Sequence, residues 1–214
     1  MTRPGYPIPA DWCDYHIRVT HYPLPLNSQN QFRFSTADIE SGTDLVMTNY
    51  PHNPSGQITT KEWWRALCEY CSDNDIRLFN DAAYYSLSHT EESATLAEVA
   101  VDYADLSWAE AYTAAKLIGN GTGWHVGAMV GSPDFIGDMK EVKGKTDAGI
   151  VAPMAAGAIA GLEEDQTGIE ACRQMYKVRL DTLIGILSDC GMRLAAQPRA
   201  GFYTLWEAPT RAGG

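Results

Sequence analysis

Short apolar runs separated by helical patterns characterise residues 45–142. Apolar positions at helical spacing predict helices at residues 61–72 and 134–142. Short buried strands are predicted at residues 45–50, 76–80, 101–106 and 126–130. Because such strands, separated by helices, form parallel sheets, the pattern predicts an α/β fold, a mostly parallel sheet with flanking helices. The order of the strands stays open.

From residue 151 onward the pattern changes. An alanine- and glycine-rich helix is predicted at residues 152–162. A longer helix is predicted at residues 168–188, and Gly191 follows it in the manner of a glycine cap. Residues 192–195 and 202–206 then predict strands that begin a second unit.

Composition and charge exclude several classes of protein. The net charge of −11 over 214 residues argues against binding of a nucleic-acid backbone as the main activity. No apolar stretch is long enough to span a bilayer, and the first residues lack an apolar signal core. We therefore expect a cytoplasmic protein with no nucleic-acid or membrane partner.

The five cysteines predict no metal site. Cys68 and Cys71 form one close pair, and a zinc site would need a second pair. The two cysteines share a helical face with Trp64 and Leu67, so core packing is favoured over a metal or redox role. The odd, irregularly spaced set fits a reducing cytoplasm.

Candidate chemistry begins at the turn formed by residues 49–56, directly after the first predicted strand. Asn53 lies between Pro51 and Pro54, and Gly56 closes the turn. The prolines stiffen the loop and the glycine permits a sharp exit, so the asparagine amide would be held in a fixed position. Ligands of open α/β sheets bind at this kind of strand end. An ordinary strand-to-helix connection remains the alternative.

Two further segments carry reactive groups. Asp81 and Tyr84 follow the second predicted strand. An aspartate there can keep a heteroaromatic nitrogen protonated, although a helix N-cap is equally expected. Lys116 precedes a glycine-rich turn. A lysine in a partly enclosed pocket can form a Schiff base with an aldehyde, whereas a solvated surface lysine is the ordinary alternative.

In their order along the chain, these segments resemble the pyridoxal-phosphate-dependent aminotransferases of fold type I, the class I/II family. The resemblance covers nearly the whole sequence. It implies that Lys116 is the Schiff-base lysine and proton shuttle, and that Asp81 pairs with the pyridinium nitrogen of the cofactor. It also implies that Asn53 contacts the cofactor and that Tyr84 contacts its phenolic oxygen.

The same resemblance implies roles for two more residues. Thr113 takes the position of a phosphate-binding serine, and Tyr6, within Pro-Gly-Tyr-Pro, is a candidate to stack on the cofactor ring. Residues 200–203, Ala-Gly-Phe-Tyr, resemble the opening of the family's small domain. Residues 142–149 are most similar to the LL-diaminopimelate aminotransferase branch.

Three departures from the family pattern stand out. His125 occupies the position of a phosphate-binding arginine, and it would be a weaker ligand for a phosphate. Lys116 lies one residue further from that position than usual, which implies an insertion near residues 119–121. The family's phosphate-cupping loop and its carboxylate-binding arginine have no counterpart, since Arg211 lies too early. The resemblance therefore implies a fragment or a degraded copy.

The resemblance divides the chain into three parts. Residues 1–166 are expected to form a partial large cofactor-binding domain, 167–190 a long interdomain helix, and 191–214 the start of a truncated small α+β domain. The implied function is transamination between an amino acid and a 2-oxo acid with pyridoxal phosphate, by a homodimer if full length. An inactive remnant that binds at most an anion or a partner, and a carbon–sulfur lyase, remain the alternatives.

Overall fold

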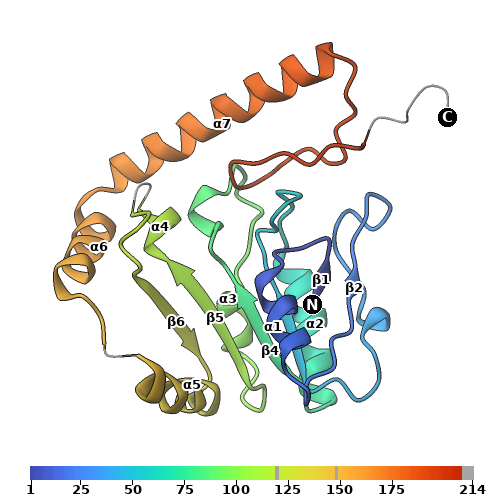
Figure 1. The fold of residues 1–214 in the computed structure, drawn as a ribbon, viewed down its shortest axis with the longest axis vertical. Coiled ribbons are helices and arrows are strands. Elements are labelled where there is room, and N and C mark those ends of the chain that lie inside the picture. Colours follow the sequence, from blue (N-terminus) through green and yellow to red (C-terminus); the bar gives the residue numbers. More distant parts are fainter. Residues whose placement is uncertain (119–120, 148, 209–214) are drawn as a thin grey trace.

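A four-stranded sheet forms the centre of the protein in the computed structural model, which describes residues 1–118, 121–147 and 149–208 (Figure 1). Its strands, in spatial order, are β3 (Leu45–Thr48), β4 (Arg77–Asp81), β5 (Trp108–Thr113) and β6 (Gly127–Gly131). β3, β4 and β5 run parallel, and β6 pairs antiparallel with β5. The carboxyl ends of three strands therefore meet at one edge of the sheet.

The register of the parallel strands places a row of polar residues across the sheet. Thr48 pairs with Asn80, and Asn80 pairs with Glu110. Successive residues of a strand point to opposite faces, so Asp81 lies on the other face, beside its register partner Ala111. Polar residues thus occupy both faces of the sheet near its carboxyl edge.

Helix α2 (Lys61–Asp73) joins β3 to β4 and packs on the sheet. It begins at Thr60, whose hydroxyl accepts a hydrogen bond from the N–H of Trp63 (3.4 Å). Its buried residues are Trp64, Leu67, Cys68 and Cys71, which confirms the predicted core face. Burial raises the pKa of both thiols to about 12, so they stay protonated at neutral pH.

Short helical elements follow the carboxyl ends of β4 and β5. The 3-10 helix η2 (Tyr85–Leu87) and helix α3 (Ala97–Ala100) lie between these two strands in the sequence. Helix α4 (Ala114–Leu117) begins directly after β5, so the backbone of Lys116 is fixed close to the end of that strand. Helix α5 (Pro133–Thr146) follows β6.

Two helices and an irregular segment complete the chain. α6 (Ala152–Glu164) leads into α7 (Gln166–Asp189), which crosses the edge of the molecule at which β5 ends and contacts η2 (Figure 1). The chain leaves α7 through Gly191 with φ at +84°, which confirms the predicted glycine cap. Residues 192–208 then return towards the loops that follow β3 and β4 (Figure 1).

The N-terminal segment packs against the turn after β3. Strand β1 (Thr2–Arg3) pairs in parallel with β2 (Leu24–Pro25), helix α1 (Ile8–Tyr15) lies between them in the sequence, and the 3-10 helix η1 (Thr36–Asp38) precedes β3. The hydroxyl of Tyr50 donates a hydrogen bond to the carbonyl of Phe32 (2.6 Å). The main hydrophobic cluster therefore combines aromatic side chains of this segment with the buried face of α2.

Three sequence predictions of strands are wrong. Residues 101–106 form turns after α3, and the actual strand is β5 at Trp108–Thr113, which was missed because Glu110 interrupts its apolar character. Residues 192–195 and 202–206 contribute only an isolated bridge between Leu194 and Trp206. The other predicted helices and strands are confirmed within a few residues, and residues 209–214 of the expected small domain lie outside the described part.

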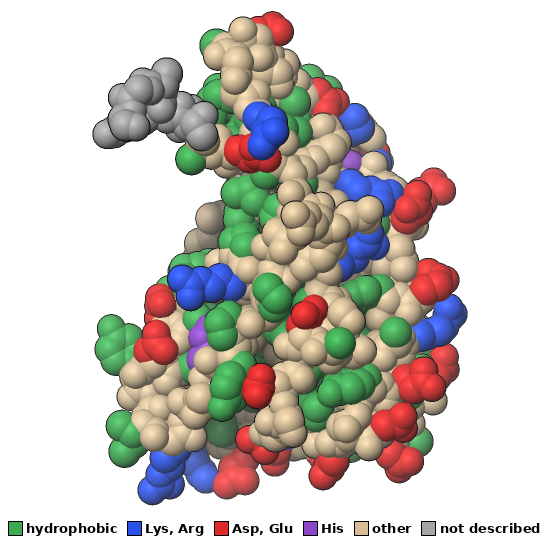
Figure 2. Space-filling model, turned by 90° about the vertical axis from the view of Figure 1, so that its right-hand side faces the viewer, with side chains coloured by type: hydrophobic (Ala, Val, Ile, Leu, Met, Phe, Trp, Pro, Cys, Tyr) green, Lys and Arg blue, Asp and Glu red, His purple; other side chains and the backbone are tan. Residues whose placement is uncertain are grey.

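The surface carries many acidic side chains, which Figure 2 shows around the edge of one face with apolar side chains between them. Across the residues that the structure describes, none of the helices is both long and apolar enough to traverse a bilayer.

Candidate active site

A cavity of about 360 Å³ lies at the carboxyl edge of β3, β4 and β5. Its polar lining residues are Thr2, Tyr6, Thr48, Asn49, Asp81, Tyr112 and Thr113. Apolar side chains, among them Met47 and Phe79, complete the lining. The structure therefore brings together three predicted site residues from distant parts of the sequence, and the volume lies within the range of small-molecule sites.

Tyr84 connects two more predicted residues, Asn53 and Lys116, beside this cavity. The side-chain amide of Asn53 donates a hydrogen bond to the Tyr84 hydroxyl (3.4 Å). The Nζ atom of Lys116 lies 5.6 Å from the centre of the Tyr84 ring, a distance at which a cation is attracted to a ring face. The turn after β3, the loop after β4 and helix α4 thus meet around one phenol ring.

Asn49 fixes the turn against β4. Its Nδ2 donates to the carbonyl of Asp81 (2.8 Å), and its Oδ1 accepts from the N–H of Asn53 (3.1 Å). The turn is therefore positioned by hydrogen bonds as well as by its prolines. No role for Asn49 was predicted from the sequence, although its place directly after a strand was a usable signal.

The carboxylate of Asp81 is largely buried at the cavity. Its Oδ1 accepts a hydrogen bond from the N–H of Ala83 (3.0 Å). Burial raises the pKa of Asp81, while the Ala83 N–H and the charge of Lys116 act in the opposite direction. Tyr84 and not Asp81 is the N-cap of η2, so the helix-cap alternative for Asp81 is wrong.

Thr113 and His125 differ in their relation to the cavity. Thr113 lines it and caps α4, because its Oγ1 accepts from the N–H of Ala115 (3.2 Å). His125 is exposed on the loop before β6, with φ at 54°, and within the described ranges no hydrogen bond joins it to the other candidates. The expected insertion near residues 119–121 lies partly outside the described residues, which omit 119 and 120.

A buried polar network supports the site from the opposite face of the sheet. Asn80 accepts from the Thr48 hydroxyl (2.8 Å) and the Tyr50 N–H (2.9 Å), and donates to Glu110 Oε1 (2.7 Å). Glu110 Oε2 accepts from the hydroxyl of Tyr112 (2.8 Å), which also lines the cavity. Sequence reasoning missed this network because its members look like ordinary polar residues of separate segments.

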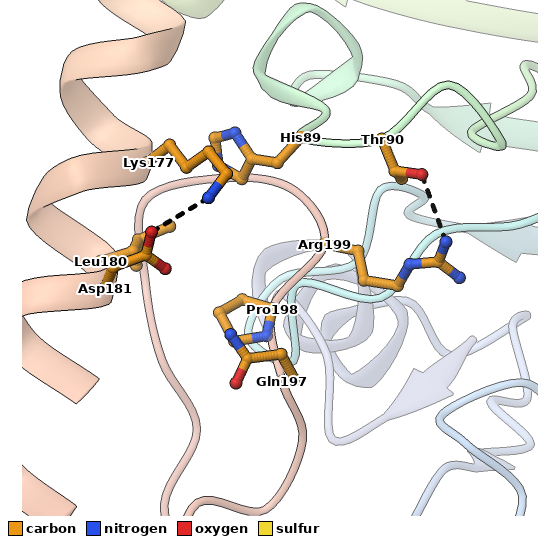
Figure 3. A pocket seen from close by; sticks show the side chains of 8 residues that line it. All are labelled: His89, Thr90, Lys177, Leu180, Asp181, Gln197, Pro198 and Arg199. Atoms are coloured by element: carbon orange, nitrogen blue, oxygen red, sulfur yellow. Dashed lines mark hydrogen bonds and ion pairs between the residues drawn. The ribbon is translucent and has the colours of Figure 1, made fainter. Parts of the chain in front are cut away.

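A second cavity, of about 290 Å³, lies between α7 and residues 197–199 (Figure 3). Its cations already have partners, because Lys177 pairs with Asp181 (3.0 Å) and Arg199 pairs with Glu92 (2.8 Å). None of the predicted site residues is among those that line it. The predicted site residues Tyr6, Asp81 and Thr113 line the cavity at the sheet edge instead.

The chain belongs to the aminotransferase class I and II family, whose model matches residues 3–210. It is similar to the LL-diaminopimelate aminotransferase of Desulforudis audaxviator, at 30% identity over 98% of this chain and 53% of that relative. The enzyme of the same name from Methanocaldococcus jannaschii is 30% identical over 100% of this chain and 51% of its own length. The predicted resemblance is confirmed, and the chain spans about half the length of the curated relatives it matches.

Solved structures establish the fold. Apo-BacF from Bacillus subtilis superposes with a TM-score of 0.89 at 24% identity, over 99% of this chain and 56% of that one. The aspartate aminotransferase of Thermotoga maritima gives a TM-score of 0.79 at 17% identity, over 98% of this chain and 55% of that one. The predicted α/β fold with an incomplete domain is thus confirmed.

Proposed function

We propose that this chain forms the cofactor-binding part of an aminotransferase that uses pyridoxal phosphate to move an amino group between an amino acid and a 2-oxo acid. The class I and II family depends on this cofactor. The observation that carries the proposal is the meeting of Asn53, Tyr84 and Lys116 beside the largely buried carboxylate of Asp81. A lysine, an acid and a phenol at one sheet edge are the groups that this chemistry needs.

The residues at the cavity fit the cofactor in chemistry and in size. Asp81 offers a largely buried acceptor for the ring nitrogen, and Tyr6 offers an aromatic face for stacking. Asn53 and Tyr84 offer donors for the phenolic oxygen. For the phosphate we propose Thr113, and His125 by its sequence position.

The reaction assigns distinct tasks to these residues. When bound, pyridoxal phosphate supplies an aldehyde and a ring that stabilises negative charge at the substrate Cα. Lys116 would hold the cofactor through Nζ and would move the proton from the substrate Cα. Asp81 would keep a proton on the ring nitrogen, and the amide of Asn53 orients the Tyr84 hydroxyl.

LL-diaminopimelate is the substrate that we propose to test first, because the relatives of highest similarity quoted above carry its name. A remnant without activity is the second candidate. One observation favours it: His125 is exposed and is not among the residues that line the cavity.

Covalent labelling of Lys116 separates these candidates. Purified protein is mixed with pyridoxal phosphate, reduced with borohydride and digested for mass spectrometry. We expect a pyridoxyl adduct on Lys116 in the wild type and in Lys140→Ala, whose substitution lies on the exposed face of α5. Lys116→Ala should lack the adduct and should release 2-oxo acid from LL-diaminopimelate roughly 10²–10⁴-fold more slowly.

Three outcomes would count against the proposal or part of it. An unlabelled wild-type protein would favour the remnant, since Lys116 would then not reach the aldehyde. Labelling that persists in Lys116→Ala would place the covalent chemistry on another amine. Labelling without release of 2-oxo acid would retain cofactor binding and reject transamination of this substrate.

We also propose the arrangement of the whole protein. Residues 1–166 would form the partial large domain, 167–190 the interdomain helix and 191–214 the start of the small domain. The exposed apolar side chains of α1 support a homodimer, because such a stripe is normally covered by another surface. The buried, protonated thiols of Cys68 and Cys71 are compatible with the cytoplasmic location that we propose.

A further inference from the structure

The segment after α7 is attached by its backbone to the walls of the candidate site. The N–H groups of Arg199 and Ala200 donate to the carbonyl of Gly56 (2.8 and 3.0 Å). The N–H of Gly201 donates to the carbonyl of Leu87, in η2 (3.0 Å). Residues 199–201 are therefore fixed against both the turn after β3 and the loop after β4.

Gly56 permits this close approach. Its φ is +67°, and a Cβ at this position would lie 2.6 Å from the Cβ of Pro198. Any larger residue would push the C-terminal segment away from the turn. The glycine that closes the turn therefore also serves as the docking point for residues 198–200.

Gly201 directs the side chain of Tyr203 back towards the site. Its φ is +80°, and a Cβ here would lie 2.8 Å from Cζ and 3.0 Å from the hydroxyl oxygen of Tyr203. The phenol ring therefore occupies the space beside a residue that has no side chain. It packs edge-on against the ring of Tyr84, with ring centroids 5.0 Å apart.

The hydroxyl of Tyr203 is buried and has no hydrogen-bond partner among the residues that the structure describes. Burial, reinforced by Tyr84 and Asp81, raises the pKa of Tyr203, so the hydroxyl keeps its proton. A buried donor without a partner is costly and rare in folded proteins. A bound molecule that accepts this proton would remove the cost.

We propose that Tyr203 is a ligand-contacting residue of the candidate site, whose hydroxyl donates a hydrogen bond to an anionic oxygen of the bound small molecule. This inference rests on the proposed function. Tyr84 supports it, because its hydroxyl accepts from Asn53 and retains its own proton for donation. Two neighbouring phenol donors with the cation of Lys116 above one ring suit an anionic oxygen.

Two oxygens have this chemistry, the phenolate of the cofactor and the carboxylate of an amino-acid substrate. Tyr203 belongs to the segment after α7. If this segment moved away from the turn after β3, the Tyr203 hydroxyl would leave the site together with residues 199–201. The contact would therefore couple ligand binding to the docking of the C-terminal segment.

The test compares Tyr203→Phe with Tyr176→Phe. Tyr176, in α7, packs on Phe202 with ring centroids 5.0 Å apart, so its variant removes a hydroxyl from the same aromatic cluster. Pyridoxal phosphate affinity is measured by absorbance titration, and LL-diaminopimelate affinity by the absorbance change of the loaded protein. Thermal unfolding without ligand shows that each variant folds.

We expect Tyr203→Phe to fold like the wild type and to bind one of the two probes roughly tenfold more weakly, as for one lost hydrogen bond to a charged group. A loss confined to pyridoxal phosphate assigns the contact to the cofactor, and a loss confined to LL-diaminopimelate assigns it to the substrate. Tyr176→Phe should bind both probes like the wild type.

Unchanged affinities of Tyr203→Phe for both probes would overturn this inference alone. An equal loss in Tyr176→Phe would also overturn it, because the effect would then come from the aromatic cluster and not from the Tyr203 hydroxyl. A wild-type protein that binds no pyridoxal phosphate would overturn the proposed function, and this inference with it.

Discussion

His52, in the turn after β3, shows how one residue couples the fold to pH. Its ring is fully buried, with Nε2 near the carbonyl of Pro4 (3.1 Å) and Nδ1 near the hydroxyl of Ser55 (2.7 Å). A carbonyl can only accept, so Nε2 carries the proton and Nδ1 accepts from Ser55. Burial lowers the pKa of His52 to about 4.

Stability should therefore fall in mild acid. Between its unfolded pKa of about 6.5 and its folded pKa of about 4, His52 is protonated only in the unfolded chain, which favours unfolding. We expect a loss of about 3 kcal/mol as the pH falls through this window, and none above it. Urea denaturation at several pH values measures it.

The matched variant is His52→Gln, whose side chain does not titrate. It should be less stable than the wild type at pH 7.5 and should lose less stability between pH 6.5 and 4. Equal pH dependence of the two proteins would show that other groups cause the acid sensitivity.

At the scale of the elements, Glu110 holds three segments together. Its carboxylate accepts hydrogen bonds from Asn80 in β4, from the N–H groups of Leu96 (3.0 Å) and Ala97 (2.8 Å), and from Tyr112. Burial raises the pKa of Glu110, whereas these donors stabilise its charged form. The carboxylate thus links β4, β5 and the start of α3.

Glu110→Gln should destabilise the fold by about 2–3 kcal/mol. The amide N–H₂ would replace an oxygen that accepts hydrogen bonds, so two donors would face each other without an acceptor. Urea denaturation measures this loss. Glu69→Gln, the same change on the exposed face of α2, should stay within about 0.5 kcal/mol of the wild type. A comparable loss in both variants would show that the destabilisation does not come from the buried hydrogen bonds of Glu110.

These elements also show what the sequence could predict. Helix α2 was predicted because Trp64, Leu67, Cys68 and Cys71 repeat at helical spacing, which is local information. Strand β5 was missed because three of the four partners that make Glu110 compatible with a buried strand lie 13–30 residues away. Local pattern predicts elements, whereas buried polar residues depend on the tertiary structure.

The residues of the candidate site also fall into two groups, those that could be predicted from the sequence and those that were missed. Asn53, Asp81, Tyr84 and Lys116 were found because their segments have characteristic sequences, and the structure brings them together. Asn49, Tyr112 and Tyr203 were not assigned. Their importance comes from contacts between segments, including the return of the chain after α7.

At the scale of the whole molecule, α1 presents an unpaired apolar stripe. Ile8, Trp12 and Tyr15 lie at helical spacing, are 46%, 62% and 83% exposed, and belong to a helix with no buried residue. Tyr6 and Pro9, next to this stripe, line the candidate cavity. A second copy of the chain covering α1 would therefore lie beside the mouth of the site.

Replacement of Trp12 and Tyr15 by serine should convert a dimer into a monomer, because it removes the largest apolar side chains of the stripe. Light scattering coupled to size exclusion measures the mass of each protein. Ile159→Ser, at a 54% exposed position of α6, is the control and should remain dimeric. A monomeric wild type, or a dimer that only Ile159→Ser disrupts, would contradict the role of α1.

Because Tyr6 adjoins the stripe, the monomeric variant should also bind pyridoxal phosphate more weakly, whereas Ile159→Ser should not.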